Sequence, residues 1–232
     1  MSIQWNKVGA LFRKDLKDAL KNPQCLILIA LPLLMVLLYT NLSFGDEGMP
    51  TAFVFSFGLL MNLSILPVTF MSMMIAEEKE KFTLRTLMLS NVSAGDFLIA
   101  KALVILLVAQ CSNAIIYAIT MPEGITLARY IPATTFTILS LLLFGALVGI
   151  LSKNQMSTGL FAAPAMLLFL LPPTLSEVSE AMAAIAKFTP TQAMMQMLEG
   201  AGSFSFNICV LLAWTVLGAA LFGLAYRRKR LD

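Results

Sequence analysis

The sequence predicts an all-α membrane protein that crosses the bilayer six times. Of its 232 residues, 59% are hydrophobic and only 12% are charged, whereas a soluble domain carries roughly 25% charged residues. The mean hydropathy of the chain is +0.84. The apolar residues gather in separate runs of the length that a hydrocarbon core of about 30 Å requires, the shorter ones with the help of flanking residues. These observations predict a single transmembrane domain over residues 1–232.

The first element, residues 1–22, is a basic segment ahead of the apolar runs. Its apolar side chains recur at three- and four-residue steps, at Trp5, Val8, Phe12, Leu16 and Ala19, with most of the lysines and Arg13 off that stripe. This pattern is typical of an amphipathic helix in the membrane interface. The plainer alternative is a basic flank that only sets orientation. Asn22-Pro23 is expected to end the segment.

The six predicted spans follow at about residues 24–39, 51–75, 97–120, 131–151, 156–173 and 206–226. Between the last two, residues 174–204 predict two short helices that do not cross the membrane. Thr189-Pro190 has the form of an N-cap followed by proline at the first helical position, and Gly200 or Gly202 would end that helix. Short helices of this kind predict a re-entrant or interfacial element on the extracytoplasmic side.

The positive charges indicate the orientation. Six spans put both termini on one side, and 14 of the 16 Lys and Arg residues then fall on that side, leaving only Arg129 and Lys187 on the other. The positive-inside rule predicts a multi-pass protein of the cytoplasmic membrane with both termini in the cytoplasm.

Several kinds of chemistry are disfavoured by composition. The chain has no His, and Cys25, Cys111 and Cys209 lie apart in apolar runs, so no metal site, bound cofactor or catalytic residue is expected. No charged residue falls in the middle of a predicted span, which disfavours ion-coupled carriers. A phosphate-binding loop is also missing from the sequence. No nucleic-acid partner is expected.

Intramembrane polar and glycine residues carry two further predictions. Asn62, Gln110 and Asn113 either form hydrogen bonds between helices or line a weakly polar translocation path. Gly145 and Gly149 stand four residues apart in the fourth span, a spacing that permits close helix approach. We interpret this pair as a contact between helices of the same chain, in preference to a dimer contact.

The polar block at residues 76–96 is the one densely charged stretch between spans. Glu77, Glu78, Lys79, Glu80 and Lys81 extend the second span as a helix, with Glu77 and Lys81 spaced for an ion pair. An apolar stretch with interspersed polar residues follows, and then Ser93 to Asp96 takes the form of a capping box that opens the third span. An exposed apolar helix rimmed by charge favours a protein partner. The alternative is a solvated helix end on lipid headgroups.

This block resembles the signature of type 2 ABC transporter permeases. The resemblance rests on the run from Glu77 to Leu87, on Ser90-Asn91-Val92-Ser93 and on Lys101, together with the order of spans along the whole chain. The sequence departs from the family pattern at Phe82, where glycine is common, and at Asn91, where proline is common.

The resemblance implies a subunit that dimerises, with itself or with a related permease, and binds two copies of a separate cytoplasmic ATPase that holds ATP and magnesium. Residues 1–22 would be the elbow helix and residues 76–96 the cytoplasmic coupling loop. The coupling-helix residues that dock the ATPase would be Phe82, Thr83, Leu84, Arg85, Leu87 and Met88. The supporting residues would be Glu77, Glu78, Glu80 and Lys81.

Function follows from that resemblance as an expectation. Short external loops favour an exporter, and the apolar, Met-bearing spans favour a hydrophobic or amphipathic substrate such as a membrane-active peptide. A lipid-like or small-molecule antibiotic substrate is an alternative. A second alternative is a non-transporting membrane anchor or sensor that docks a cytoplasmic partner. An intramembrane enzyme is disfavoured, since the sequence has no His and no paired intramembrane carboxylates.

Overall fold

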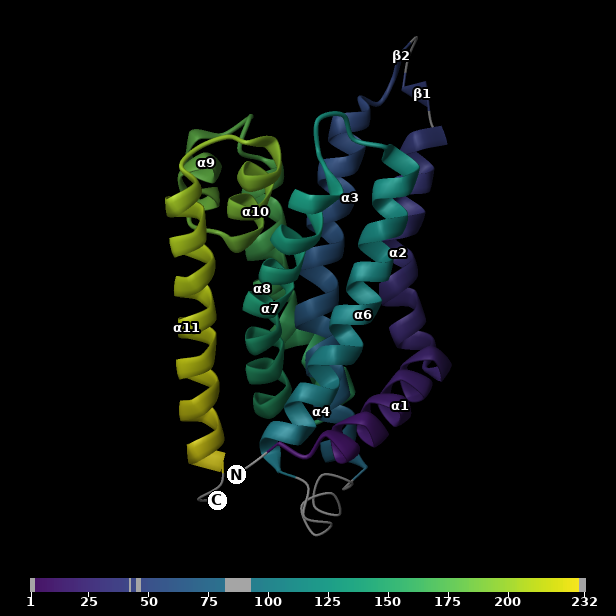
Figure 1. The fold of residues 1–232 in the computed structure, drawn as a ribbon, viewed down its shortest axis with the longest axis vertical. Coiled ribbons are helices and arrows are strands. Elements are labelled where there is room, and N and C mark those ends of the chain that lie inside the picture. The colour runs from purple at the N-terminus through teal and green to yellow at the C-terminus, as the bar shows by residue number, and fades with distance from the viewer. Residues whose placement is uncertain (1–2, 42, 45–46, 82–92, 230–232) are drawn as a thin grey trace.

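The computed structural model describes residues 3–41, 43–44, 47–81 and 93–229. Within these ranges the chain is an upright bundle of helices with a further helix laid across one end (Figure 1). Six of the described helices are long and apolar enough to cross a membrane. The fold class predicted from the sequence, an all-α membrane protein with six spans, is therefore confirmed.

The helices follow the predicted order with slightly wider bounds. The first helix is α1 (Trp5–Lys21), and the spans are α2 (Pro23–Asn41), the continuous α3 (Thr51–Ile65), η1 (Leu66–Phe70) and α4 (Met71–Glu80), then α6 (Ala94–Thr120), α7 (Leu127–Leu151), α8 (Gln155–Thr174) and α11 (Phe204–Lys229). The two short helices before α11 are α9 (Glu180–Ala186) and α10 (Pro190–Glu199). A two-residue antiparallel hairpin, β1 (Ser43–Phe44) with β2 (Glu47–Gly48), joins α2 to α3.

The bundle has two distinct ends. We call the end at which α1 lies the α1 end; the last turns of α4 and α11 and the first turn of α6 also lie there (Figure 1). We call the opposite end, which carries α9 and α10, the α10 end. The helix α11 stands at the edge of the bundle and packs on α7 and α10.

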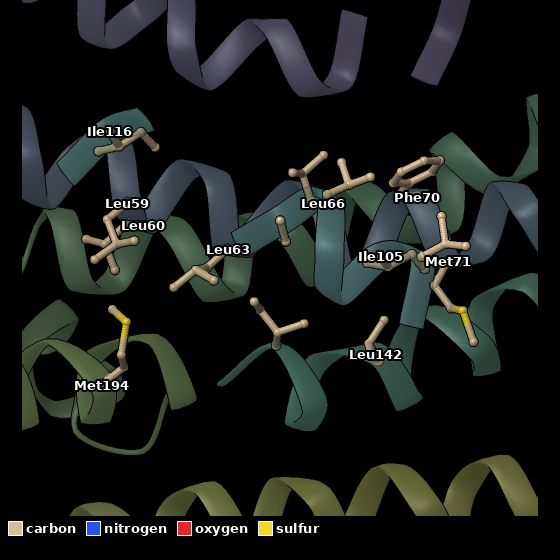
Figure 2. Packing of buried hydrophobic residues seen from close by; sticks show 14 of the residues in the cluster. Leu59, Leu60, Leu63, Leu66, Phe70, Met71, Ile105, Ile116, Leu142 and Met194 are labelled. Atoms are coloured by element: carbon tan, nitrogen blue, oxygen red, sulfur yellow. The ribbon is translucent and has the colours of Figure 1, made fainter. Parts of the chain in front are cut away.

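The second span is the centre of the bundle. Leu59, Leu63, Leu66 and Phe70 from this span are fully buried. Figure 2 shows them facing Ile105 and Ile116 of α6, Leu142 of α7 and Met194 of α10. A span surrounded by other helices on every side must be apolar all round, and its sequence is.

A short π-helical turn, η1, interrupts the second span around Pro67. Proline has no backbone N–H and its ring crowds the carbonyl four residues earlier, so a regular α-helix cannot continue through it unchanged. The span remains one continuous helix because neighbouring helices pack against the irregular turn.

Gly145 and Gly149 of α7 lie in close contact with the second span, Gly145 at the irregular turn and Gly149 further along α4. A Cβ at Gly145 would lie 2.6 Å from the carbonyl oxygen of Pro67, and one at Gly149 would lie 2.8 Å from Cβ of Ile75. Both distances are far too short for non-bonded atoms. The interpretation of this glycine pair as internal packing is therefore confirmed, since the partner is the second span of the same chain.

The predicted helix ends are also confirmed. Ser93 and Asp96 form a capping box at the start of α6, with both hydrogen bonds present. Thr189 caps α10 through its side chain, and Gly200 ends that helix in the left-handed conformation with φ of 71°. The helix α10 tucks into the bundle, because Ala193 and Met194 are buried. Whether α9 and α10 lie in the membrane interface stays a prediction.

Candidate functional site

The last turn of the second span lies at the α1 end, next to the segment predicted to dock an ATPase. Glu77, Glu78, Lys79 and Glu80 are the last residues of α4, and Lys81 follows as its C-cap. Lys81 and Glu77 form the ion pair that their spacing predicts. The other three side chains reach neighbouring helices: Glu78 reaches α1 and α6, Lys79 reaches α7 and Glu80 reaches α8.

Glu78 takes part in a cluster of four charges, three of them buried, which we call the ionic junction: Lys14 and Asp15 of α1, Glu78 of α4 and Lys101 of α6. The exposed member is Lys14, at 44%. The Lys14 ammonium lies 2.5 Å from Oε1 of Glu78, and the Lys101 ammonium lies 3.1 Å from Oδ2 of Asp15. Lys101 also lies 3.6 Å from Oε1 of Glu78. Two cations and two anions therefore balance one another where three helices cross.

Burial makes this cluster energetically important. The side chains of Lys101, Asp15 and Glu78 are 1%, 4% and 6% exposed. A buried charge is tolerated only when it is paired and hydrogen-bonded. The Lys101 ammonium also lies 4.7 Å from the ring centroid of Phe97, in the geometry of a cation–π contact. Removal of Asp15, Glu78 or Lys101 would leave the remaining buried charges only partly compensated.

The two α1 members of the junction have shifted pKa values. Burial raises the pKa of the Asp15 carboxyl above its ordinary value, against the opposing charge and hydrogen bond of Lys101. Burial lowers the pKa of the Lys14 ammonium, but the hydrogen bond and charge of Glu78 outweigh it, so that this pKa lies above its ordinary value. A cavity of about 110 Å³ lies beside these groups and is lined by Asp18, Cys25 and Met74 as well.

Lys79 and Glu80 extend these connections to the fourth and fifth spans. The Lys79 ammonium donates to the carbonyl oxygens of Ile150, at 2.8 Å, and Ser152 at the end of α7. A cation at this position complements the partial negative charge of a helix C-terminus. The Glu80 carboxylate accepts a hydrogen bond of 3.1 Å from the backbone N–H of Gln155 at the start of α8. The end of α4 therefore contacts four other helices: α1, α6, α7 and α8.

Asp96 provides a second connection between α1 and α6. Its carboxylate accepts hydrogen bonds from the backbone N–H of Ser93, at 3.2 Å, and from that of Gln4, at 3.0 Å. The starts of the two helices are therefore fixed to each other. Val8 and Leu11 of α1 pack on Ala100 one turn further along α6.

The three polar residues considered for a translocation path lie together between α3, α6 and α7. Asn62 donates to Oδ1 of Asn113 at 2.7 Å, and Gln110 donates to Oγ1 of Thr135 at 2.6 Å. Asn62 and Asn113 are fully buried, whereas Gln110 is partly exposed. The network therefore supplies hydrogen bonds between helices, and within the trio Gln110 has the accessible side chain.

The structure reaches only part of the predicted docking site. Phe82, Thr83, Leu84, Arg85, Leu87 and Met88 lie outside the described residues. The supporting residues Glu77, Glu78, Glu80 and Lys81 are described, and they are brought together with α1, α6 and α8.

Sequence reasoning missed Asp15 and its pairing with Lys101. The buried residues of α1 are Val8, Leu11, Asp15 and Ala19. The buried face and the predicted stripe have Val8 and Ala19 in common. The buried face also includes Leu11 and Asp15, whereas Trp5 of the predicted stripe is 68% exposed. The available signal was an acidic residue at helical spacing from Leu11 and Ala19, in a segment otherwise dominated by lysine.

Within the residues that the structure describes, no three His, Cys, Asp or Glu side chains gather as a set of metal ligands. The site instead consists of fixed ion pairs and helix-end contacts. Such an arrangement suits mechanical coupling between helices more than bond-making chemistry.

The six long apolar helices and their packing define a multi-pass membrane protein. The description "ABC-2 family transporter protein" belongs to the family that matches residues 46–226. Since the match covers most of the chain, the protein belongs to this family and is the membrane subunit of an ABC transporter. The family forms membrane transport components and implies an ABC ATPase partner. A comparison with curated proteins finds no match.

Proposed function

We propose that this chain is the membrane-spanning subunit of an ATP-driven exporter, which forms its translocation path as a dimer and docks two separate ATPase subunits. Both termini and the segment after α4 would lie in the cytoplasm. Fourteen of the 16 basic residues fall on that side under this orientation, which supports it. The ATP and magnesium would be bound by the partner chains.

The observation that carries this proposal is the connection of the α4 end to four other helices. A force applied to the segment directly after Lys81 would reach α1 and α6 through the ionic junction, α7 through Lys79 and α8 through Glu80. A rigid connection of this kind can turn closure of an ATPase pair into a rigid-body movement of the spans. Glu77 and Lys81 would hold the last turn of α4 in helical form.

A hydrophobic or amphipathic substrate, such as a membrane-active peptide, fits the lack of charge in the middle of the spans. Gln110 is the candidate path residue whose side chain is accessible, and Asn62 and Asn113 would support it from behind. The short connection between α6 and α7 leaves little room to receive a substrate-capturing partner on the α10 end, which favours export.

The direct test is to place a charge in the docking segment. The Leu84→Asp and Leu87→Asp variants should lose co-purification with the ATPase, because an apolar contact would then have to bury a carboxylate. Leu84→Met keeps an apolar side chain of similar size and should retain the ATPase. Unchanged association and transport in both Asp variants would refute the docking assignment.

Substrate class is tested separately. The assembled complex is incubated with a panel of amphipathic peptides and lipids, and ATP hydrolysis is measured. Stimulation by peptides supports the peptide assignment, whereas stimulation by lipids alone favours the lipid-like alternative. An ATPase complex that forms normally but transports none of the panel in vesicles would favour an anchor or sensor.

A further inference from the structure

A cavity of about 590 Å³ lies between α7, α10 and α11, at the α10 end and far along the chain from the ionic junction. Its volume falls within the range of about 300–1,000 Å³ found for small-molecule pockets. Neither the family assignment nor the coupling proposal uses it. The lining residues of interest are Arg129, Pro132, Phe136 and Ser140 of α7 with Leu212 and Thr215 of α11.

The lining has a charged part and an apolar part. Arg129 lies in the first turn of α7 and is exposed, and within the described residues its guanidinium has no carboxylate partner. From Arg129 to Ser140 the lining follows α7 over a distance of roughly 16 Å of helix. Ser140 is buried, and its hydroxyl is already bonded to that of Thr215 at 2.9 Å. Because this hydroxyl already has a hydrogen-bond partner, an apolar ligand can lie against this part of the lining without leaving the hydroxyl unsatisfied.

The surface around the cavity faces outward. Phe136, Leu212 and Phe204 line it and are 59%, 57% and 65% exposed. In a protein that spans the membrane, such apolar side chains on outer helices contact lipid chains. A ligand can thus enter sideways from the bilayer, and an arginine at a helix end can extend its head toward the polar surface.

We propose that this cavity binds an anionic phospholipid from the leaflet at the α10 end, with the phosphate on Arg129 and one acyl chain along Phe136 and Leu212. Guanidinium presents a planar pair of donors that matches a phosphate. The charge distinguishes this ligand from a helix of a second copy, because a phosphate complements the guanidinium of Arg129 whereas an apolar helix face offers it no counter-charge. This binding depends neither on the ATPase nor on the direction of transport.

The first test uses the purified full-length chain in detergent micelles and native mass spectrometry. Phosphatidylglycerol and phosphatidylcholine with identical acyl chains are offered at equal concentration. The wild type should retain phosphatidylglycerol with about tenfold higher apparent affinity, as expected for one charge-assisted contact. Arg129→Gln should abolish that difference. Lys187→Gln, which removes the other basic residue predicted to lie on that side but does not line the cavity, should leave it unchanged.

The second test fills the apolar part. Leu212→Trp places a larger side chain in the cavity and should lower retention of both lipids at least severalfold. Leu217→Trp lies on the same helix at a comparably exposed position outside the lining, and should have no effect. Equal retention of the two lipids by the wild type would overturn the proposal. Unchanged binding in both Arg129→Gln and Leu212→Trp would overturn it as well. If no lipid is bound and Leu212→Trp abolishes a dimer of the chain, the occupant of the cavity is a second copy, and the proposal is overturned too.

Discussion

At the scale of single residues, Lys101 and Asp15 illustrate how much depends on a pairing between distant parts of the chain. They are 86 positions apart, and both are almost completely buried. Each charge is acceptable in the interior because opposite charges of the ionic junction surround it: Asp15 has Lys101 and Lys14 nearby, and Lys101 has Asp15 and Glu78. The sequence singled out Lys101 as part of the family resemblance, but it did not predict the partner, because nothing local to Asp15 distinguishes a buried carboxylate from a solvated one.

Loss of Lys101 is expected to destabilise the protein strongly. Lys101→Met removes the buried ammonium from Asp15 and leaves it only the half-exposed Lys14 at 3.7 Å, so the free energy of unfolding should fall by up to about 3–5 kcal/mol. Combining it with Asp15→Leu should restore most of that loss, since Lys14 and Glu78 still pair. Thermal unfolding of the detergent-solubilised chain measures both effects.

The exposed pair provides the control for this comparison. Lys81 is 63% exposed, so Lys81→Met should change the free energy of unfolding by no more than about 1 kcal/mol. If Lys101→Met and Lys81→Met unfolded at the same temperature, the ionic junction would have no special role in stability.

At the scale of helices, the structure shows why α7 carries glycine where it meets the second span. The irregular turn at Pro67 presents backbone carbonyls to α7, and a side chain on Gly145 would collide with them. The glycine spacing predicted close approach in the sequence. It did not reveal the partner, because the same pattern serves dimer contacts equally well.

Gly145→Ala should therefore destabilise the bundle. The added methyl group would sit 2.6 Å from the carbonyl oxygen of Pro67 and 2.7 Å from Cβ of Met71, so the two helices must separate. We expect a loss of about 1–3 kcal/mol in the free energy of unfolding, measured by thermal unfolding in detergent.

Gly159→Ala is the matched change in a neighbouring helix. A Cβ at Gly159 meets no atom within 4 Å, so alanine should be neutral or stabilise α8 by up to about 1 kcal/mol. Similar unfolding temperatures for the two alanine variants would show that the α7 contact tolerates a side chain.

At the scale of the whole molecule, the arrangement of the spans separates most of the basic residues from Arg129 and Lys187, and this separation indicates the orientation in the membrane. The starts of α1 and α6, the end of α4 and the end of α11 share one end of the bundle, while Arg129 and Lys187 lie toward the other (Figure 1). The proposed orientation places the α1 end in the cytoplasm.

Cysteine labelling in intact cells tests that orientation. Lys153→Cys and Lys187→Cys are introduced singly after Cys25, Cys111 and Cys209 have been replaced by alanine. Both lysines are exposed and lie at opposite ends of the bundle. A membrane-impermeant maleimide should label the cysteine at position 187 directly and the one at position 153 only after permeabilisation. The reverse pattern would invert the proposed topology.

The sequence by itself determined the number and order of the spans, the capping box at Ser93 and Asp96, and the end of α10 at Gly200. These features depend on hydrophobicity and on backbone chemistry within a few residues. Only the tertiary structure decided which face of α1 is buried, that Asp15 meets Lys101, and that Gly145 packs on Pro67. Those contacts depend on how helices cross in space, which short-range patterns along a chain do not encode.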